Sequence, residues 1–167
     1  MENTKRKKCS RCKKLKRATQ FSLVKNGKRN DECRACAYDG LTANEKHKIL
    51  REAYRNYLSF EQYVKDTAKD IIEYAVPEKP GSDNYIPVQI SFTDLQRALT
   101  QYHNGVKAEG TVLSKRKEEA FYLNVIRDML QRDVAEEMGI TTVSVGQYVE
   151  QAMIQLCDYY FDEEKDT

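Results

Sequence analysis

The sequence predicts a mainly α-helical protein with a small N-terminal module built around four cysteines. Two Cys-x2-Cys pairs stand near the N-terminus. Apolar residues at helical spacing, preceded by capping residues, recur through the remainder of the chain. Basic residues concentrate in residues 1–40, which hold 13 Lys and Arg against 4 Asp and Glu. The chain of 167 residues is therefore expected to fold as small units, without one large core.

The composition argues against a membrane or secreted protein. No window approaches the roughly 18 apolar residues of a membrane helix, and the N-terminus MENTKRKKCS has no apolar stretch typical of a signal peptide. We therefore expect the protein in the bacterial cytoplasm or nucleoid. Cysteines are kept reduced there, so close cysteine pairs favour metal ligation over disulfides.

Residues 1–40 form the predicted cysteine module. Each Cys-x2-Cys pair can form a tight knuckle, and four thiolates suit one tetrahedral zinc ion. Few apolar side chains are present, so burial alone cannot hold this segment together. Asn26-Gly27 predicts a hairpin turn between the pairs. The alternative is four unrelated reduced thiols. The predicted Zn²⁺ ligands are Cys9, Cys12, Cys33 and Cys36.

The run CSRCKKLKRATQFSLVKNGKRNDECRAC resembles the zinc ribbons of phage and bacterial HNH-endonuclease-related proteins, with their CxxC, lysine, Phe, KxGxR, CxxC order. The resemblance implies a zinc ribbon over residues 9–36 only. The resemblance does not imply catalytic activity, because neither of the two histidines, His47 and His103, stands in a His-Asn-His context. A metal-dependent nuclease needs a base and ion ligands. We therefore assign no catalytic residues and expect no enzyme.

The basic residues of the module are interpreted as contacts to nucleic-acid phosphates, the alternative being a solvated surface. Residues 41–167 hold 15 basic against 22 acidic residues, so a basic end precedes an acidic body. A zinc tetrathiolate carries about −2, which leaves a positive excess. Such contacts give affinity without much sequence choice. The residues are Lys5, Arg6, Lys7, Lys8, Arg11, Lys13, Lys14, Lys16, Arg17, Lys25, Lys28 and Arg29.

Residues 41–76 are predicted to be a helical spacer. Thr42 and Glu45 form a capping box that opens a helix to about Tyr57. A second helix is expected from about Phe60 to Ala75, because its apolar residues recur at helical spacing.

Residues 77–90 hold all three prolines and are predicted to be an extended linker. Residues 91–112 follow as a short helical segment. Its cap is Ser91 or Thr93, and its end is expected near His103–Gly105.

Residues 113–161 have the clearest periodic pattern and predict three helices. These run from about Ser114 to Leu130, from Gln131 to Met138, and from a cap at Thr141 or Thr142 to about Tyr160. Ala135, four residues before Gly139, suits two closely crossing helices, and the glycine can take the positive φ of the turn. The spacing predicts a helix-turn-helix. Residues 162–167 are an acidic tail.

With the preceding helix LSKRKEEAFYLNVIRDML, the runs RDVAEEMGIT and TVSVGQYVEQAM resemble region four of bacterial primary-type sigma factors and related response-regulator output domains. The resemblance implies DNA binding. Glutamine can read adenine, as Gln147 would here. The carried-over base-reading positions are Thr142, Val143, Ser144 and Gln147, with Arg132 and Thr141 near the phosphates.

The chain departs from this family in its charge. No lysine or arginine lies between Asp133 and Glu164, so DNA contact by this unit alone is expected to be weak. The nearby basic cluster comprises Lys115, Arg116 and Lys117. Two alternatives stay open for the unit: a protein-facing role, since the same domain of sigma factors docks on RNA polymerase, and a purely structural one. Residues with either a partner-facing or a core role are Tyr148, Met153, Tyr159, Tyr160 and Phe161; Cys157 is expected to be a buried small apolar residue.

These observations lead to the hypothesis of a phage-type, sigma-like transcription regulator that binds DNA and contacts bacterial RNA polymerase. One alternative is an accessory of DNA processing, in packaging or recombination. Another is a zinc-ribbon protein related to nucleases.

Overall fold

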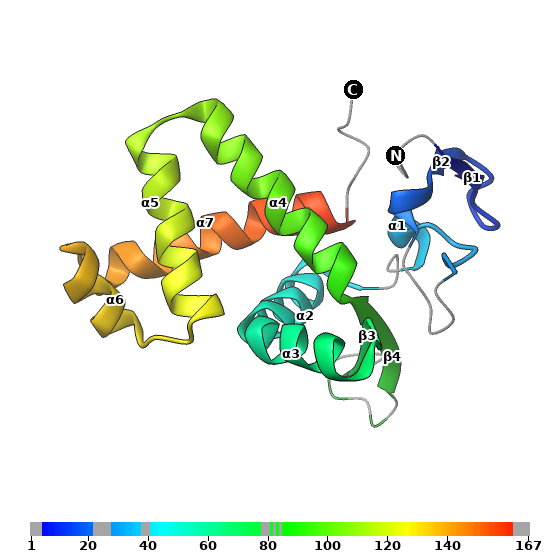
Figure 1. Ribbon diagram of the computed structural model, residues 1–167, viewed down its shortest axis with the longest axis horizontal. Helices are drawn as coiled ribbons and strands as arrows, with labels where there is room; N and C mark the ends of the chain where they lie inside the picture. The colour runs from blue at the N-terminus through cyan, green and yellow to red at the C-terminus, as the bar shows by residue number, and fades with distance from the viewer. Residues whose placement is uncertain are drawn as a thin grey trace.

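The computed structural model describes residues 5–21, 28–37, 41–77, 81, 83 and 85–161. Over these residues the protein is mainly α-helical, with a small cysteine-containing module at its N-terminal end, as the sequence predicted. Figure 1 shows this module at one end of the long axis and helix α6 at the other. No helix among the described residues combines the length and apolar character needed to cross a membrane.

The cysteine module consists of short elements. Strands β1 (Arg6–Lys8) and β2 (Leu15–Arg17) pair antiparallel, and a 3-10 turn, η2 (Ala18–Gln20), follows. Helix α1 (Arg34–Ala37) begins next to the second cysteine pair. A small cluster of Cys9, Phe21 and Cys33 forms the core of the module. The predicted turn at Asn26-Gly27 lies outside the described residues.

The middle segment begins with two helices. Helix α2 (Ala43–Arg55) has the predicted capping box, in which Thr42 and Glu45 cap each other's backbone N–H groups. Helix α3 spans Tyr57–Thr67 and ends at Ala68, which has a left-handed φ of 56°. The prediction of one helix to Ala75 is therefore wrong beyond Thr67.

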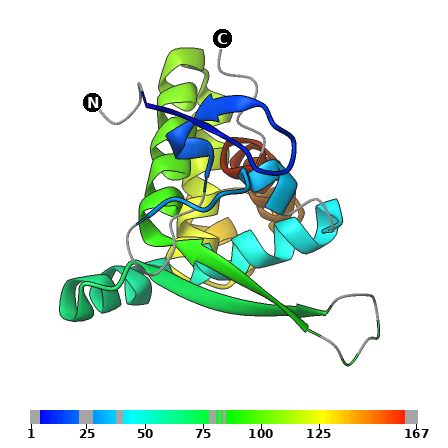
Figure 2. The ribbon, with the colours of Figure 1, turned by 90° about the vertical axis from the view of Figure 1, so that its right-hand side faces the viewer.

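A two-stranded ribbon occupies the sequence that was expected to be helix and linker. Strand β3 (Ile71–Pro77) pairs antiparallel with β4 (Tyr85–Ser91). The predicted linker over residues 77–90 is thus wrong for the residues of β4. β-Branched and aromatic residues in both segments favour strands once each has a partner. Figure 2 shows the ribbon extending past the helices.

Helix α4 (Phe92–Glu109) follows the ribbon directly and is longer than predicted. Ser91 is its N-cap, and it ends at Gly110, where φ is 67°. Gly105, expected near the helix end, lies inside the helix instead. A Cβ at this position would lie 2.8 Å from the Tyr159 hydroxyl, so glycine lets α7 approach closely.

The last segment contains the three predicted helices with one correction. Helix α5 (Val112–Phe121) continues into a π-helical turn, η3 (Tyr122–Ile126), and does not extend to Leu130. The amide of Asn124 donates to the Met129 carbonyl oxygen at 2.8 Å and so holds the chain as it leaves the helix. Helices α6 (Gln131–Met138) and α7 (Thr142–Phe161) flank a turn at Gly139, where φ is 67°.

One hydrophobic core joins the helices from α2 to α7. Tyr54 of α2 packs edge-on against Phe121 of α5 and donates to the Leu95 carbonyl oxygen of α4 at 2.9 Å. The middle segment is therefore part of the same body as the C-terminal helices, and the prediction of small units without one large core is wrong for these described residues. The aromatic stripe of α7 belongs to this core: Met153, Tyr160 and Phe161 are buried, and Tyr148, Cys157 and Tyr159 pack against them.

Candidate metal centre and helix-turn-helix surface

The four cysteines converge on one point. Cys9 follows β1, Cys12 lies in the turn before β2, Cys33 precedes α1 and Cys36 lies within it. Their sulfur atoms all lie within 4.8 Å of one another. A tetrahedral ion with metal–sulfur bonds of about 2.3 Å needs sulfurs roughly 3.8 Å apart. The cluster is therefore compatible with one metal ion, as predicted.

Backbone hydrogen bonds form the two knuckles. The Cys9 sulfur accepts from the N–H groups of Cys12 and Cys33, each at 3.4 Å. Lys13 closes the first knuckle by donating its N–H to the Cys9 carbonyl oxygen, with a left-handed φ of 62°. The Ser10 N–H donates to the Asp31 carbonyl oxygen at 2.9 Å, which ties the first knuckle to the second. The site is thus assembled by backbone geometry.

The thiols differ in acidity because their environments differ. Burial opposes ionisation of Cys9, yet donated backbone N–H groups, led by that of Cys33, lower its pKa to about 6. Burial raises the pKa of Cys36 to about 12, and hydrogen bonds with the other thiols add to this. Four adjacent thiols cannot all ionise without a compensating cation. A bound metal ion would supply that compensation.

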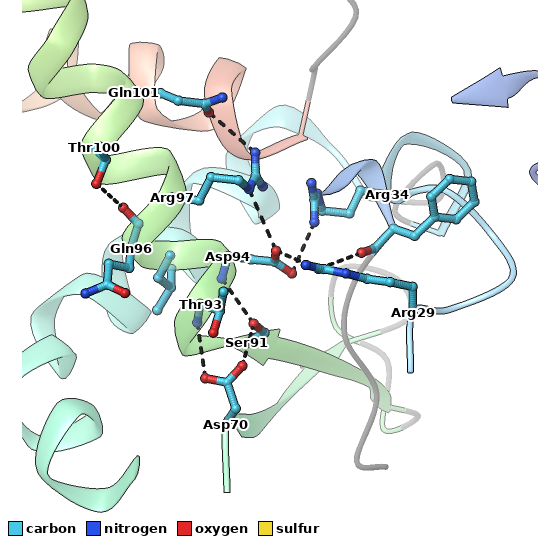
Figure 3. A network of polar contacts seen from close by, with 12 residues as sticks. Arg29, Arg34, Asp70, Ser91, Thr93, Asp94, Gln96, Arg97, Thr100 and Gln101 are labelled. Atoms are coloured by element: carbon cyan, nitrogen blue, oxygen red, sulfur yellow. Dashed lines mark hydrogen bonds and ion pairs between the residues drawn. The ribbon is translucent and has the colours of Figure 1, made fainter. Parts of the chain in front are cut away.

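A buried ion cluster joins the module to the helical body. Asp94, in the first turn of α4, is 0% exposed. Its carboxylate oxygens lie 3.0 Å from Arg29, 3.1 Å from Arg34 and 3.8 Å from Arg97. Figure 3 shows the three arginines around this carboxylate. The Arg34 guanidinium also lies 5.4 Å from the centre of the Tyr160 ring in α7.

The sequence did not reveal this cluster. Arg29 was expected on phosphate, but it donates to Asp94 and to the Phe21 carbonyl oxygen. Arg34 received no role, although it stands between two predicted ligands. The only sequence feature of Asp94 is its place in the first turn of a helix. Acidic residues are common there, and many of them are exposed, so this feature does not indicate a buried ion cluster.

Other basic residues of the module also make internal contacts. Lys7 donates to the Arg29 carbonyl oxygen at 2.8 Å and lies 3.2 Å from Asp31. Arg11 donates to the Cys36 carbonyl oxygen at 2.7 Å, and Lys13 to that of Ser10. Lys16 is half-buried, and Lys25 lies outside the described residues. The exposed cations are Lys5, Arg6, Lys8, Arg11, Lys13, Lys14, Arg17 and Lys28.

The predicted base-reading residues lie at the start of α7. Thr142, Val143 and Gln147 are exposed, with Val143 68% exposed, and Ser144 is half-buried. Thr141 is the helix cap: its hydroxyl oxygen accepts from the Ser144 N–H at 3.1 Å. Thr141 also donates to the Ser144 hydroxyl, so these two side chains already bond each other.

The predicted phosphate contacts near α6 divide into two kinds. Arg132 is exposed at the start of α6, and Lys115 is exposed on α5. Arg116, in contrast, donates to the Met138 carbonyl oxygen at 2.7 Å and closes the last turn of α6. Lys117 is half-buried. Arg116 therefore has a structural contact that the sequence did not reveal.

Helix α2 places two basic side chains near Glu150 of α7, and the sequence did not predict this proximity. Burial and the nearby Arg51 lower the pKa of His47, whereas Glu150 of α7 acts in the opposite direction. Burial also lowers the pKa of Arg51, and Glu150 again opposes this. Glu150 thus lies close enough to act on both side chains, of which Arg51 is the cation at neutral pH.

The described residues define a mainly α-helical protein with a four-cysteine site that can hold a metal ion. No protein-family model, no curated protein and no solved structure matches the chain significantly.

Proposed function

We propose that this protein is a zinc-dependent, DNA-binding transcription regulator. Four thiolates in a closed tetrahedral arrangement suit structural zinc, which is bound without an open position for substrate or water. Such a site serves folding, and no catalytic role is assigned to it.

The observation that carries the proposal is the cationic face of the β1–β2 ribbon. Arg6 lies directly opposite Arg17, and both are exposed together with Lys8. A phosphate backbone laid across this face would contact these cations and release counterions. The ribbon would supply affinity, and Thr142, Val143 and Gln147 would supply base contacts.

The first test compares two variants of equal charge change. One carries Arg6→Gln, Lys8→Gln and Arg17→Gln; the control carries Gln at Lys48, Lys69 and Lys107, which are exposed elsewhere. Fluorescence anisotropy with duplex DNA should give roughly tenfold or greater loss of affinity for the first variant only, and a salt dependence reduced by about 0.9 per lost phosphate contact. Equal losses in both variants would contradict a specific ribbon face.

The second test addresses sequence choice. Selection of bound duplexes from a random pool should yield a preferred site for the wild-type protein. Alanine at Thr142, Ser144 and Gln147 should flatten that preference and leave the ribbon-dependent affinity in place. If the variant keeps the wild-type preference for one DNA sequence, the helix-turn-helix does not read the DNA bases.

The acidic residues around α7 favour a partner protein as a second component. Glu136, Glu137 and Glu150 are exposed on α6 and α7. A pull-down of tagged protein from nuclease-treated host lysate should recover RNA polymerase if the regulator contacts it. Recovery of a nuclease or a packaging motor would favour the alternative of a DNA-processing accessory.

A further inference from the structure

The two knuckles of the cysteine module place their arginines differently. Arg11, between Cys9 and Cys12, is exposed and donates to the Cys36 carbonyl oxygen at 2.7 Å. Arg34, between Cys33 and Cys36, is 1% exposed. The Arg34 side chain leaves the module and contacts Asp94 of α4 and the ring of Tyr160 in α7. The second knuckle therefore contains the residue that reaches the helical body.

Asp94 depends on the module for its charge compensation. Two of its three arginine partners, Arg29 and Arg34, come from the module and lie at 3.0 and 3.1 Å. The third, Arg97 on its own helix, lies at 3.8 Å. Undocking of the module would therefore remove two of the three partners of Asp94 and expose the first turn of α4 to water.

The position of Arg34 depends in turn on the cysteines. Helix α1 has only four residues, which is too short to persist on its own. Cys33 and Cys36 flank Arg34 and would both be fixed by one metal ion. Without the ion, the described residues support this turn through a few hydrogen bonds, the buried cluster of Cys9, Phe21 and Cys33, and the contacts of Arg34 itself with Asp94 and Tyr160.

We propose that the four-cysteine site is a metal-dependent latch. Metal binding holds Arg34 on Asp94, so metal occupancy determines whether the basic module is docked on the helical body. The module and the α6–α7 end are then held in a fixed relation only in the metal-bound protein. This inference concerns docking within the chain and does not depend on the proposed DNA binding.

Hydrogen-exchange mass spectrometry on the full chain tests the latch. The zinc-loaded protein is compared with protein from which zinc has been removed by a chelator under reducing conditions. We expect amides of residues 5–37 and of 92–95 to exchange on the order of tenfold faster without zinc, while α5 and α6 stay protected. Faster exchange confined to 5–37 would overturn the proposal. Equal acceleration over all helices would also overturn it, because zinc would then support the whole fold.

Two arginine variants separate the latch from general effects of the metal. Arg34→Leu should still bind one zinc, since all ligands remain, but residues 92–95 should no longer respond to zinc removal. Arg6→Leu, the same change at an exposed position of the module, should keep the wild-type response. If Arg34→Leu does not fold, Arg34→Lys serves instead and should reduce the response at least threefold, because a lysine cannot reproduce the guanidinium geometry. A wild-type response in the Arg34 variant would overturn the latch.

Discussion

Arginines that look equivalent in the sequence have different environments in the folded chain. Arg34 is buried against Asp94, whereas Arg6 and Arg17 face solvent on the ribbon. Arg116 belongs with Lys115 and Lys117 to the predicted DNA-contacting cluster, yet its guanidinium donates to the Met138 carbonyl oxygen at the end of α6. The role of each arginine is therefore decided by which backbone or carboxylate oxygen it reaches.

The contact between Arg116 and Met138 leads to a stability prediction. Arg116→Ala should lower the free energy of unfolding by about 1.5 kcal/mol, because a charged hydrogen bond to a helix's last turn is lost. Lys115→Ala should change the free energy of unfolding by no more than a few tenths of a kcal/mol. Urea unfolding of the zinc-loaded protein measures both. Equal effects would mean that the Met138 contact contributes nothing specific.

Gly105 provides a second residue-scale prediction. Replacing a glycine inside a helix by alanine normally stabilises by up to about 1 kcal/mol. Here the new Cβ would meet the Tyr159 hydroxyl at 2.8 Å. Gly105→Ala should therefore stabilise the protein more in a Tyr159→Phe background than in the wild type, by about 0.5 kcal/mol or more. A thermodynamic cycle of the four proteins gives this difference, and a value of zero would exclude the close contact.

At the scale of elements, helix caps follow directly from local sequence. Thr42 with Glu45, Ser91, and Thr111 each bond an N–H in the first turn of their helix. Thr141 does the same for α7. A cap needs only one side chain three residues before the N–H that it bonds, so such signals are readable from the sequence.

The cap of α7 can be separated from its predicted DNA contacts. Thr141→Ala should cost about 1 kcal/mol of stability, whereas Thr141→Ser should retain most of it. Thr142→Ala, at an exposed neighbouring position, should lower the stability by a few tenths of a kcal/mol at most. Thermal unfolding compares the three. Similar losses for Thr141→Ala and Thr142→Ala would show that the capping bond does not stabilise α7.

The ribbon of β3 and β4 could not be predicted from local sequence. Ile71 to Val76 contains apolar residues that also fit one side of a helix. A strand over these residues becomes stable only when β4 pairs with it and supplies the backbone hydrogen bonds. Helix propensity is a weak preference, and the pairing overrides it.

For the molecule as a whole, metal binding at the four cysteines should depend on pH through the thiols. Metal binding requires deprotonated cysteines and releases their protons. The pKa of Cys9 is lowered to about 6, so this thiol is mostly ionised at neutral pH and protonated well below it. Cys36, whose pKa is raised to about 12, must release its proton at any of these pH values.

Metal affinity should therefore fall with pH throughout this range, and it should fall more steeply below about pH 6, where Cys9 is protonated as well. The number of protons released per zinc should rise by about one between about pH 7.5 and about pH 5, because Cys9 then contributes its own proton. Calorimetric titration in buffers of different ionisation enthalpy measures this number. A constant proton count would contradict the low pKa of Cys9.

Short-range sequence patterns predicted the cysteine cluster, the capping box of α2 and the bounds of α6, and they narrowed the caps of α4 and α7 to two residues each. The Thr111 cap of α5 was not predicted. Each depends on residues a few positions apart: two Cys-x2-Cys knuckles, a threonine before a helix, a glycine after one. The mainly α-helical class follows from the same local signals. These predictions succeeded because the interaction and its sequence signature have the same short range.

The tertiary structure decided what those elements contact. Arg29 and Asp94 are 65 residues apart, and neither position carries a signal that points to the other. The same holds for the common core of α2 and α7, for the closing contact of Arg116 and for the pairing of β3 with β4. The charge or hydrophobicity of a residue indicates that it needs a partner in the folded protein. Many residues of the same type could be that partner, and the tertiary fold determines which of them lies close enough.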